Sequence, residues 1–212
     1  MGGWFQMKEL TKSRFNLLLG LFILYGVILN VITAYLLAGH VFTNSEIIGT
    51  LVLSLVCGIV GVFIALKNDQ PAVSFLGYNM LVIPFGLMLS MVVQLYSPMV
   101  VFEAFFLTAM IMICMIVAAT IKPEWFEGLG TVLFIALIGL IIAEVICIFM
   151  GIAPLWISAI SALVFSCYIG YDWTRAQSGP KTVDAAIDSA LSIYLDIVNL
   201  FLDLLRIVGD ND

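Results

Sequence analysis

Charged side chains are scarce in this chain, and their scarcity excludes most soluble proteins. Only 10% of the 212 residues are Asp, Glu, Lys or Arg, whereas 63% are hydrophobic. The mean hydropathy is +1.19. Soluble domains usually carry about 25% charged residues. The composition therefore predicts an integral membrane protein whose main surroundings are the lipid bilayer.

Basic clusters, cysteine motifs and histidine are also missing or rare. Eight Lys and Arg residues, scattered along the chain, are too few to form a nucleic-acid surface, so we expect no nucleic-acid partner. The four cysteines lie in apolar runs without CxxC spacing, and we expect free thiols. No Ser/His pair, phosphate-binding glycine loop or metal-ligand cluster is present. We therefore predict that the protein is not an enzyme and needs no cofactor. His40 is expected to be a solvated loop residue.

Long apolar runs are what the sequence has in abundance. Seven of them approach the ~20 residues that a helix needs to cross a bilayer. They span residues 16–38, 47–66, 72–93, 100–121, 128–150, 152–171 and 186–208. The runs are continuous rather than alternating, which disfavours a β-barrel. With short connectors between them, they predict an all-α fold, one seven-helix transmembrane domain over residues 1–212.

The positions of Lys and Arg predict the orientation of the chain. The connectors near residues 39–46, 94–99 and 151 contain none. Seven of the eight basic residues fall on the opposite side, namely Lys8, Lys12, Arg14, Lys67, Lys122, Arg175 and Lys181. Because Lys and Arg concentrate on the cytoplasmic side, we expect a cytoplasmic N-terminus and, after seven spans, an outer C-terminus. The short loops favour a prokaryotic plasma membrane.

The last apolar run differs from the others because polar residues follow one of its faces. At 3.6 residues per turn one stripe contains Asp188, Ser192, Asp196, Asn199, Asp203 and Arg206. An acid at the centre of a membrane helix costs about 2.5–3.5 kcal/mol, so the stripe needs protein or water opposite it. We therefore expect this helix to be central, with six helices around it. The alternative is that the stripe joins packed helices by hydrogen bonds.

Individual acids and amides suggest different roles. Asp203 and Arg206, at i and i+3, are expected to form an outer structural pair. Asn199 is a candidate pore-lining group, and Glu103 is a candidate residue of the ion path. Glu103 and Glu144 fit a structural role equally well.

The end of the chain carries the most specific motifs. YIGYDW at Tyr168–Trp173, followed by ALSIYLDIVNLFLDLLRIVG at Ala190–Gly209, resembles the C-terminal part of the Bax inhibitor-1 family, also called the transmembrane Bax inhibitor motif family. VVFEAF at Val100–Phe105 resembles the fourth span of that family, and the seven-span layout agrees over nearly the whole chain. The resemblance implies six helices around a central seventh, and a pH-sensitive calcium leak across the membrane.

The resemblance also implies a site. The family's paired-carboxylate sensor, at the cytoplasmic mouth of the pore, corresponds to Asp172 and Asp196. Two close carboxylates share a proton and titrate as a unit. Losing that proton leaves oxygens suited to Ca²⁺, so both acids are candidate calcium ligands, with calcium ions and protons as partners. Some members latch the span-six acid with an Arg at the end of span two. In this chain the corresponding segment, ALKNDQP, contains Lys67 as its only basic residue. A lysine ammonium is a point charge and lacks the paired donors with which an arginine binds a carboxylate.

Three rival functions use the same residues. An intramembrane aspartyl protease would explain two acids, but YLDIVN lacks a Gly-x-Gly-Asp setting and no Pro-Ala-Leu motif follows. A non-conducting regulatory or scaffold protein would bind another membrane complex and pass no ions. A proton-coupled cation exchanger would show saturable flux that moves protons stoichiometrically.

Overall fold

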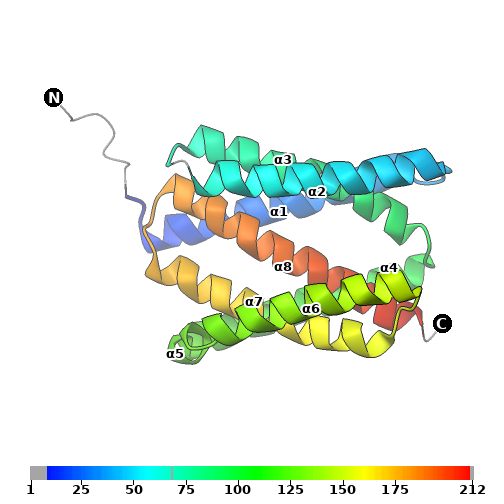
Figure 1. Cartoon of the computed structure of the whole chain (residues 1–212). Coiled ribbons are helices and arrows are strands. Elements are labelled where there is room, and N and C mark those ends of the chain that lie inside the picture. Colours follow the sequence, from blue (N-terminus) through cyan, green and yellow to red (C-terminus); the bar gives the residue numbers. More distant parts are fainter. Residues whose placement is uncertain (1–8, 68, 211–212) are drawn as a thin grey trace. The chain divides into compact units, whose positions relative to one another are not determined.

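The computed structural model describes residues 9–67 and 69–210, and all regular structure in these ranges is helical. The helices, labelled in Figure 1, are α1 (Lys12–Leu36), α2 (Asn44–Leu66), α3 (Pro71–Val93), α4 (Pro98–Ile121), α5 (Pro123–Glu127), α6 (Gly130–Met150), α7 (Leu155–Ser178) and α8 (Val183–Gly209). The predicted all-α class is confirmed for the described part of the chain.

Six of these helices are long and apolar enough to cross a membrane: α1, α2, α3, α4, α6 and α7. They correspond to the first six apolar runs of the sequence. The helix α8 has 27 residues, which is ample length for a crossing, but its acids and Arg206 make it less apolar than the other six. A seventh crossing and a central position for α8 therefore stay predictions.

Two helix boundaries differ from the expectation. The connector KPEWFEG contains the short helix α5, which begins at Pro123, a residue whose fixed φ suits the first position of a helix. The helix α7 continues about two turns beyond residue 171, to Ser178, because Arg, Ala and Gln favour helix and Pro180 follows only later. Asp172 consequently lies within α7 and does not close it.

Local capping explains where α2 and α4 begin. The Thr43 side chain accepts a hydrogen bond from the Glu46 backbone N–H, and the Thr43 N–H donates to Glu46 Oε2 at 2.7 Å, which completes a capping box. In the same way Ser97 caps α4, and Pro98 follows at its first position. Such pairs satisfy backbone donors that a helix start leaves without partners.

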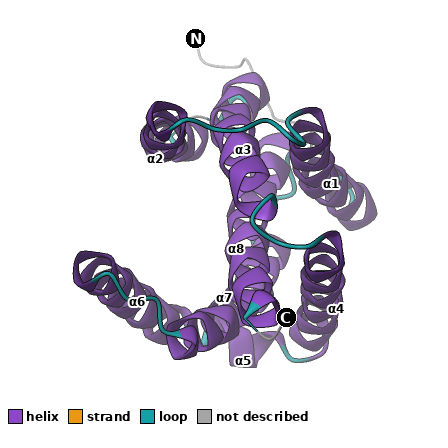
Figure 2. Ribbon diagram, turned by 90° about the vertical axis from the view of Figure 1, so that its right-hand side faces the viewer, coloured by secondary structure: helices purple, strands orange, loops and turns teal. Residues whose placement is uncertain are grey.

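The chain forms two compact units, and the first contains α1, α2, α3 and α8 up to Ser192. Within it, α3 packs between α1 and α2 (Figure 2). The backbones of α2 and α3 approach closely at Gly61 and Gly77. A Cβ added at Gly61 would lie only 2.5 Å from the carbonyl oxygen of Gly77. Glycine is therefore needed at this crossing because no side chain fits between the helices.

A proline lies inside α3 of the first unit. Pro84 has no N–H and so cannot donate to the preceding turn. The buried Ser54 of α2 donates a hydrogen bond to the Pro84 carbonyl oxygen at 2.9 Å. This bond joins α2 to α3 at the proline, whereas the carbonyl that loses its helical donor is that of Met80, four residues earlier.

The second unit contains α4, α5, α6, α7 and α8 from Ile193 onward. Here α7 packs against α4, α5 and α6 (Figure 2). Leu133 and Leu140 of α6 form an apolar cluster with Ile157 and Val164 of α7. At the other end of α7, Gly170 leaves room for the ring of Phe126 from α5. These contacts position α7, which carries Asp172.

Candidate functional site: a carboxyl pair in the second unit

Asp172 of α7 and Asp196 of α8 meet in the second unit. Their side chains hydrogen-bond to one another, a contact that two carboxyl groups can make only while one of them holds a proton. Asp196 is deeply buried, with 6% of its surface exposed, whereas Asp172 is only partly buried. The two acids expected from the terminal motifs are thus brought together by neighbouring helices.

Two further residues of α7 surround the pair. Tyr168 precedes Asp172 by one turn and interacts electrostatically with both carboxyls. Arg175, exposed and three residues after Asp172, interacts electrostatically with that acid. Neither residue is among those predicted from the sequence, although their i−4 and i+3 spacing from Asp172 places all three on one face of a helix.

The pair has unused capacity to bind a ligand. Within the described residues, the second carboxyl oxygen of Asp196, Oδ2, is buried and has no hydrogen-bond partner. A carboxylate oxygen can accept a proton, a water or a cation. The described part of the chain contains no group of three or more His, Cys, Asp or Glu that could hold a metal. A calcium ion here would therefore depend largely on water or backbone oxygens to reach its usual 6–8 ligands.

A second polar group lies farther along α8. Asp203 accepts a hydrogen bond from the buried Ser161 of α7 and interacts electrostatically with Arg206 and with Glu144 of α6. The expected pair of Asp203 and Arg206 is thus part of a larger group. Only the presence of charged residues on these helices was visible in the sequence. The hydrogen bond from Ser161 to Asp203 could not be predicted from the sequence, because serine is common in helices of every kind.

A cavity of about 380 Å³ adjoins this second group. Its lining residues come from α6, α7 and α8 of the same unit: Leu137, Leu140, Ile141, Glu144, Ser161, Phe165, Asn199, Leu202 and Asp203. Asn199, the candidate pore-lining residue, therefore borders a cavity together with two acids. Most of the remaining wall is apolar.

Three other residues singled out in the sequence lie on α4, at the end of α2 and in the loop before α2. Glu103 is exposed on α4, and its role in an ion path stays a prediction. Lys67, in the first unit, holds its ammonium over the ring of Phe63 at 5.4 Å from the ring centre. A latch between Lys67 and Asp172 also stays a prediction. His40 pairs with Glu46, with 3.4 Å between Nε2 and Oε1.

The first turn of α8, in the first unit, contains an acid that is not part of the predicted stripe. Asp184, in the first turn of α8, is buried and accepts a hydrogen bond from Ser74 of α3 at 2.6 Å. Asp188, a member of the stripe, lies one turn later and interacts electrostatically with Asp184 and Asp69.

Comparisons with known proteins agree with the membrane assignment. A family model described as "Inhibitor of apoptosis-promoting Bax1" matches residues 7–212. An uncharacterized membrane protein of Streptococcus pyogenes serotype M1 is 35% identical over 173 residues, which cover 77% of this chain and 74% of the relative. One from Vibrio cholerae serotype O1 is 39% identical over 115 residues, or 53% and 51% of the two chains. An uncharacterized protein of Helicobacter pylori strain J99 is 34% identical over 125 residues, or 58% and 53%.

Proposed function

This chain belongs to the Bax inhibitor-1 family, and from that premise we propose that it is a pH-sensitive calcium leak channel of a prokaryotic plasma membrane. The observation that carries the proposal is the hydrogen-bonded pair of Asp172 and Asp196. Paired carboxyls between two helices offer a proton-dependent link and, once deprotonated, a cation site.

The proposed mechanism rests on competition between a proton and calcium for the same oxygens. While one proton is shared, the hydrogen bond between Asp196 and Asp172 ties α7 to α8. Removing the proton leaves two negative charges that repel each other, so the tie is lost. The freed oxygens then attract a hard divalent cation. Calcium binding by the pair, and with it the flux, should therefore rise as the pH rises.

The surroundings of α8 support a path along this helix. No residue between Val183 and Gly209 is exposed, as expected for a helix whose polar stripe is shielded from lipid. In the proposal α8 is the central seventh crossing. Asn199 lines the path beyond the pair, and Asp203 and Arg206 hold its outer end together with Ser161 and Glu144. Lys67 and Glu103 keep the candidate roles of latch and ion-path residue.

The test is calcium flux into proteoliposomes that contain the purified protein, measured from about pH 5 to 8. Asp172→Asn and Asp196→Asn keep the shape of each side chain but remove its titration. We expect the wild type to pass calcium with a rate that rises with pH, and either variant to lose most of that dependence. Asp210→Asn, at an exposed acid just after α8, is the matched control and should behave as the wild type.

Other outcomes identify the rival functions. Wild-type flux no greater than that of empty liposomes at every pH would overturn the channel and favour a scaffold that binds another membrane complex. Saturable flux with a fixed number of protons moved per calcium, reported by a trapped pH dye, would favour a cation exchanger. Unchanged pH dependence in both Asn variants would remove the carboxyl pair from the mechanism.

A further inference from the structure

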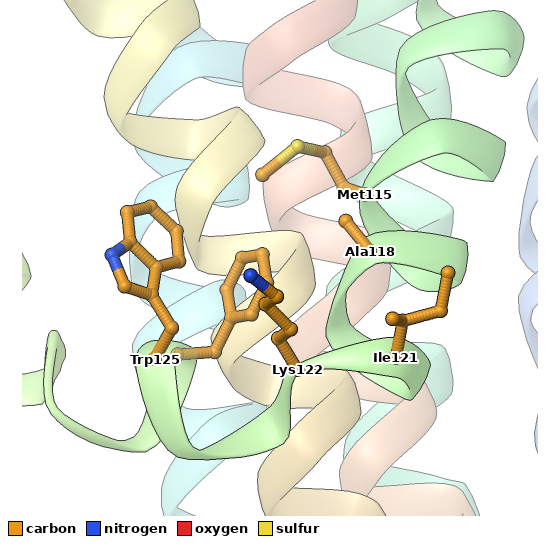
Figure 3. A pocket seen from close by; sticks show the side chains of 6 residues that line it. Met115, Ala118, Ile121, Lys122 and Trp125 are labelled. Atoms are coloured by element: carbon orange, nitrogen blue, oxygen red, sulfur yellow. The ribbon is translucent and has the colours of Figure 1, made fainter.

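A groove outside the carboxyl pair lies where α4 ends and α5 begins, wholly within the second unit. Its volume is about 400 Å³, inside the range of roughly 300–1,000 Å³ usual for small-ligand sites. Figure 3 shows the groove, which is lined by Met115, Ala118, Ile121, Lys122, Trp125 and Phe126.

The walls of the groove are exposed at the surface of the second unit. α4 is one of the six helices apolar enough to cross the bilayer, and Ile121 in its last turn is 71% exposed. Trp125, across the groove on α5, is 56% exposed. Large apolar side chains exposed on a membrane helix are covered by lipid hydrocarbon. The occupant of this groove must therefore present an apolar chain to Met115, Ala118 and Ile121.

The wall of the groove is almost wholly apolar, and its one basic residue, Lys122, contributes the aliphatic stem while the ammonium stands at the rim. Lys122 is the only ionisable residue of its lining. In Figure 3 the Lys122 side chain lies between Trp125 and Ile121. Glu124 and Glu127 are exposed but three residues apart on α5, which places them on the side of this helix away from Trp125 and Phe126. Neither acid lines the groove.

A tryptophan and a lysine at the end of a membrane span mark the level of the lipid headgroups. Basic pockets at this level recognise acidic headgroups. The lining has no acid that would hold the ammonium of a choline or ethanolamine headgroup. We propose that this groove binds an anionic phospholipid, with one acyl chain along Met115, Ala118 and Ile121 and the phosphate at the ammonium of Lys122.

The proposal is tested with brominated lipids, which quench tryptophan fluorescence on contact. The full-length protein keeps Trp125 as its only tryptophan after replacement of Trp4, Trp156 and Trp173 by Phe. It is reconstituted in phosphatidylcholine that contains a small fraction of either dibrominated phosphatidylglycerol or dibrominated phosphatidylcholine. We expect dibrominated phosphatidylglycerol to bind about fivefold more tightly than dibrominated phosphatidylcholine, because one lysine near the membrane surface contributes about that factor to the binding of an anionic lipid.

Lys122→Gln should abolish the preference without abolishing quenching, because the acyl groove remains. Lys12→Gln, at the exposed first residue of α1, is the matched control and should keep the preference. Equal quenching by the two lipids in the unsubstituted single-tryptophan protein would overturn the proposal, as would a preference that survives Lys122→Gln or one that is also lost in Lys12→Gln. Relief of quenching by millimolar inorganic phosphate would instead indicate a free-phosphate site and would overturn the lipid assignment. Circular dichroism of each variant verifies folding.

Discussion

At the scale of single residues, the acids of α8 differ in what they are bonded to. Asp184 accepts from the hydroxyl of Ser74, and Asp203 accepts from the hydroxyl of Ser161. Asp196 alone among these three is bonded to another acid, Asp172. A hydroxyl donor can stabilise a carboxylate at any pH, whereas two carboxyls can hydrogen-bond only while a proton is present. The pH-sensitive contact is therefore expected at Asp196.

The bond between Ser74 and Asp184 gives a residue-scale prediction about stability. Ser74→Ala leaves a buried carboxylate without the hydroxyl that donates to it, and such losses cost about 1–3 kcal/mol. We expect the free energy of unfolding, measured by titration with a denaturing detergent in mixed micelles, to fall by that amount.

Ser90→Ala is the matched control for Ser74→Ala. Ser90 is equally buried on the same helix, but its hydroxyl donates only to the Leu87 carbonyl oxygen of its own helix, at 2.6 Å. Its replacement should change the free energy of unfolding far less. Equal losses in the two variants would mean that the contact with Asp184 contributes nothing to stability.

At the scale of helices, α2 and α3 are held together by close backbone approach. Gly61 and Gly77 face each other, so the two helices pack with no side chain between their backbones. Van der Waals contact between closely packed backbones drives helix association in lipid. The Ser54 hydroxyl adds a hydrogen bond to α3 at Pro84. The packing of α2 against α3 therefore depends on the absence of a side chain at Gly61 and Gly77.

Gly61→Ala should force α2 and α3 apart, because the added Cβ would lie 2.5 Å from a backbone oxygen that cannot move independently. Overpacking of this kind costs about 1–3 kcal/mol. The loss should appear in the same mixed-micelle unfolding titration. Gly49→Ala in α2 adds the same methyl where nothing lies within 4 Å, and it should leave stability within about 0.5 kcal/mol of the wild type. Similar losses in both variants would exclude the crossing as their cause.

At the scale of the whole molecule, the number of crossings decides on which side the C-terminus lies. Six helices have the hydropathy of membrane spans, and α8 has the length but not the hydropathy. A helix with several acids can cross if protein surrounds it, which hydropathy alone does not register. The orientation of the termini thus depends on whether α8 spans the membrane.

Labelling of single cysteines measures this topology. In a variant whose four cysteines are replaced by alanine, we introduce either Ser178→Cys or Asp210→Cys, both at exposed positions that flank α8. If α8 crosses, a membrane-impermeant maleimide added to intact cells should modify only the protein with Asp210→Cys. Modification of both proteins, or of neither until the cells are permeabilised, would contradict a seventh crossing.

Much of the fold was predictable because hydropathy reports directly on residues that lipid must cover. The first six of the seven apolar runs correspond to α1–α4, α6 and α7, with boundaries shifted by a few residues. The late end of α7 and the short α5 were missed because their polar residues carry no hydropathy signal. Local helix propensity, read at residues 172–178, would have extended α7.

The candidate site was predictable only in part. Asp172 and Asp196 were identified from the terminal motifs, but their contact depends on how α7 and α8 cross, which spacing along the chain does not specify. Ser74 and Ser161 could not be predicted as partners of acids because single serines occur on many helix faces. The cavity beside Asn199 and Asp203 arises from three helices packed together, and no local pattern encodes such a space.

The continuity of α8 limits how the length of this chain can change during evolution. One helix carries both Asp184, bonded to Ser74, and Asp196, bonded to Asp172, and no break separates them. A single inserted or deleted residue between them would turn one acid by about 100° about the helix axis relative to the other. Homologous chains should therefore tolerate gaps in their connectors but keep this twelve-residue spacing unchanged.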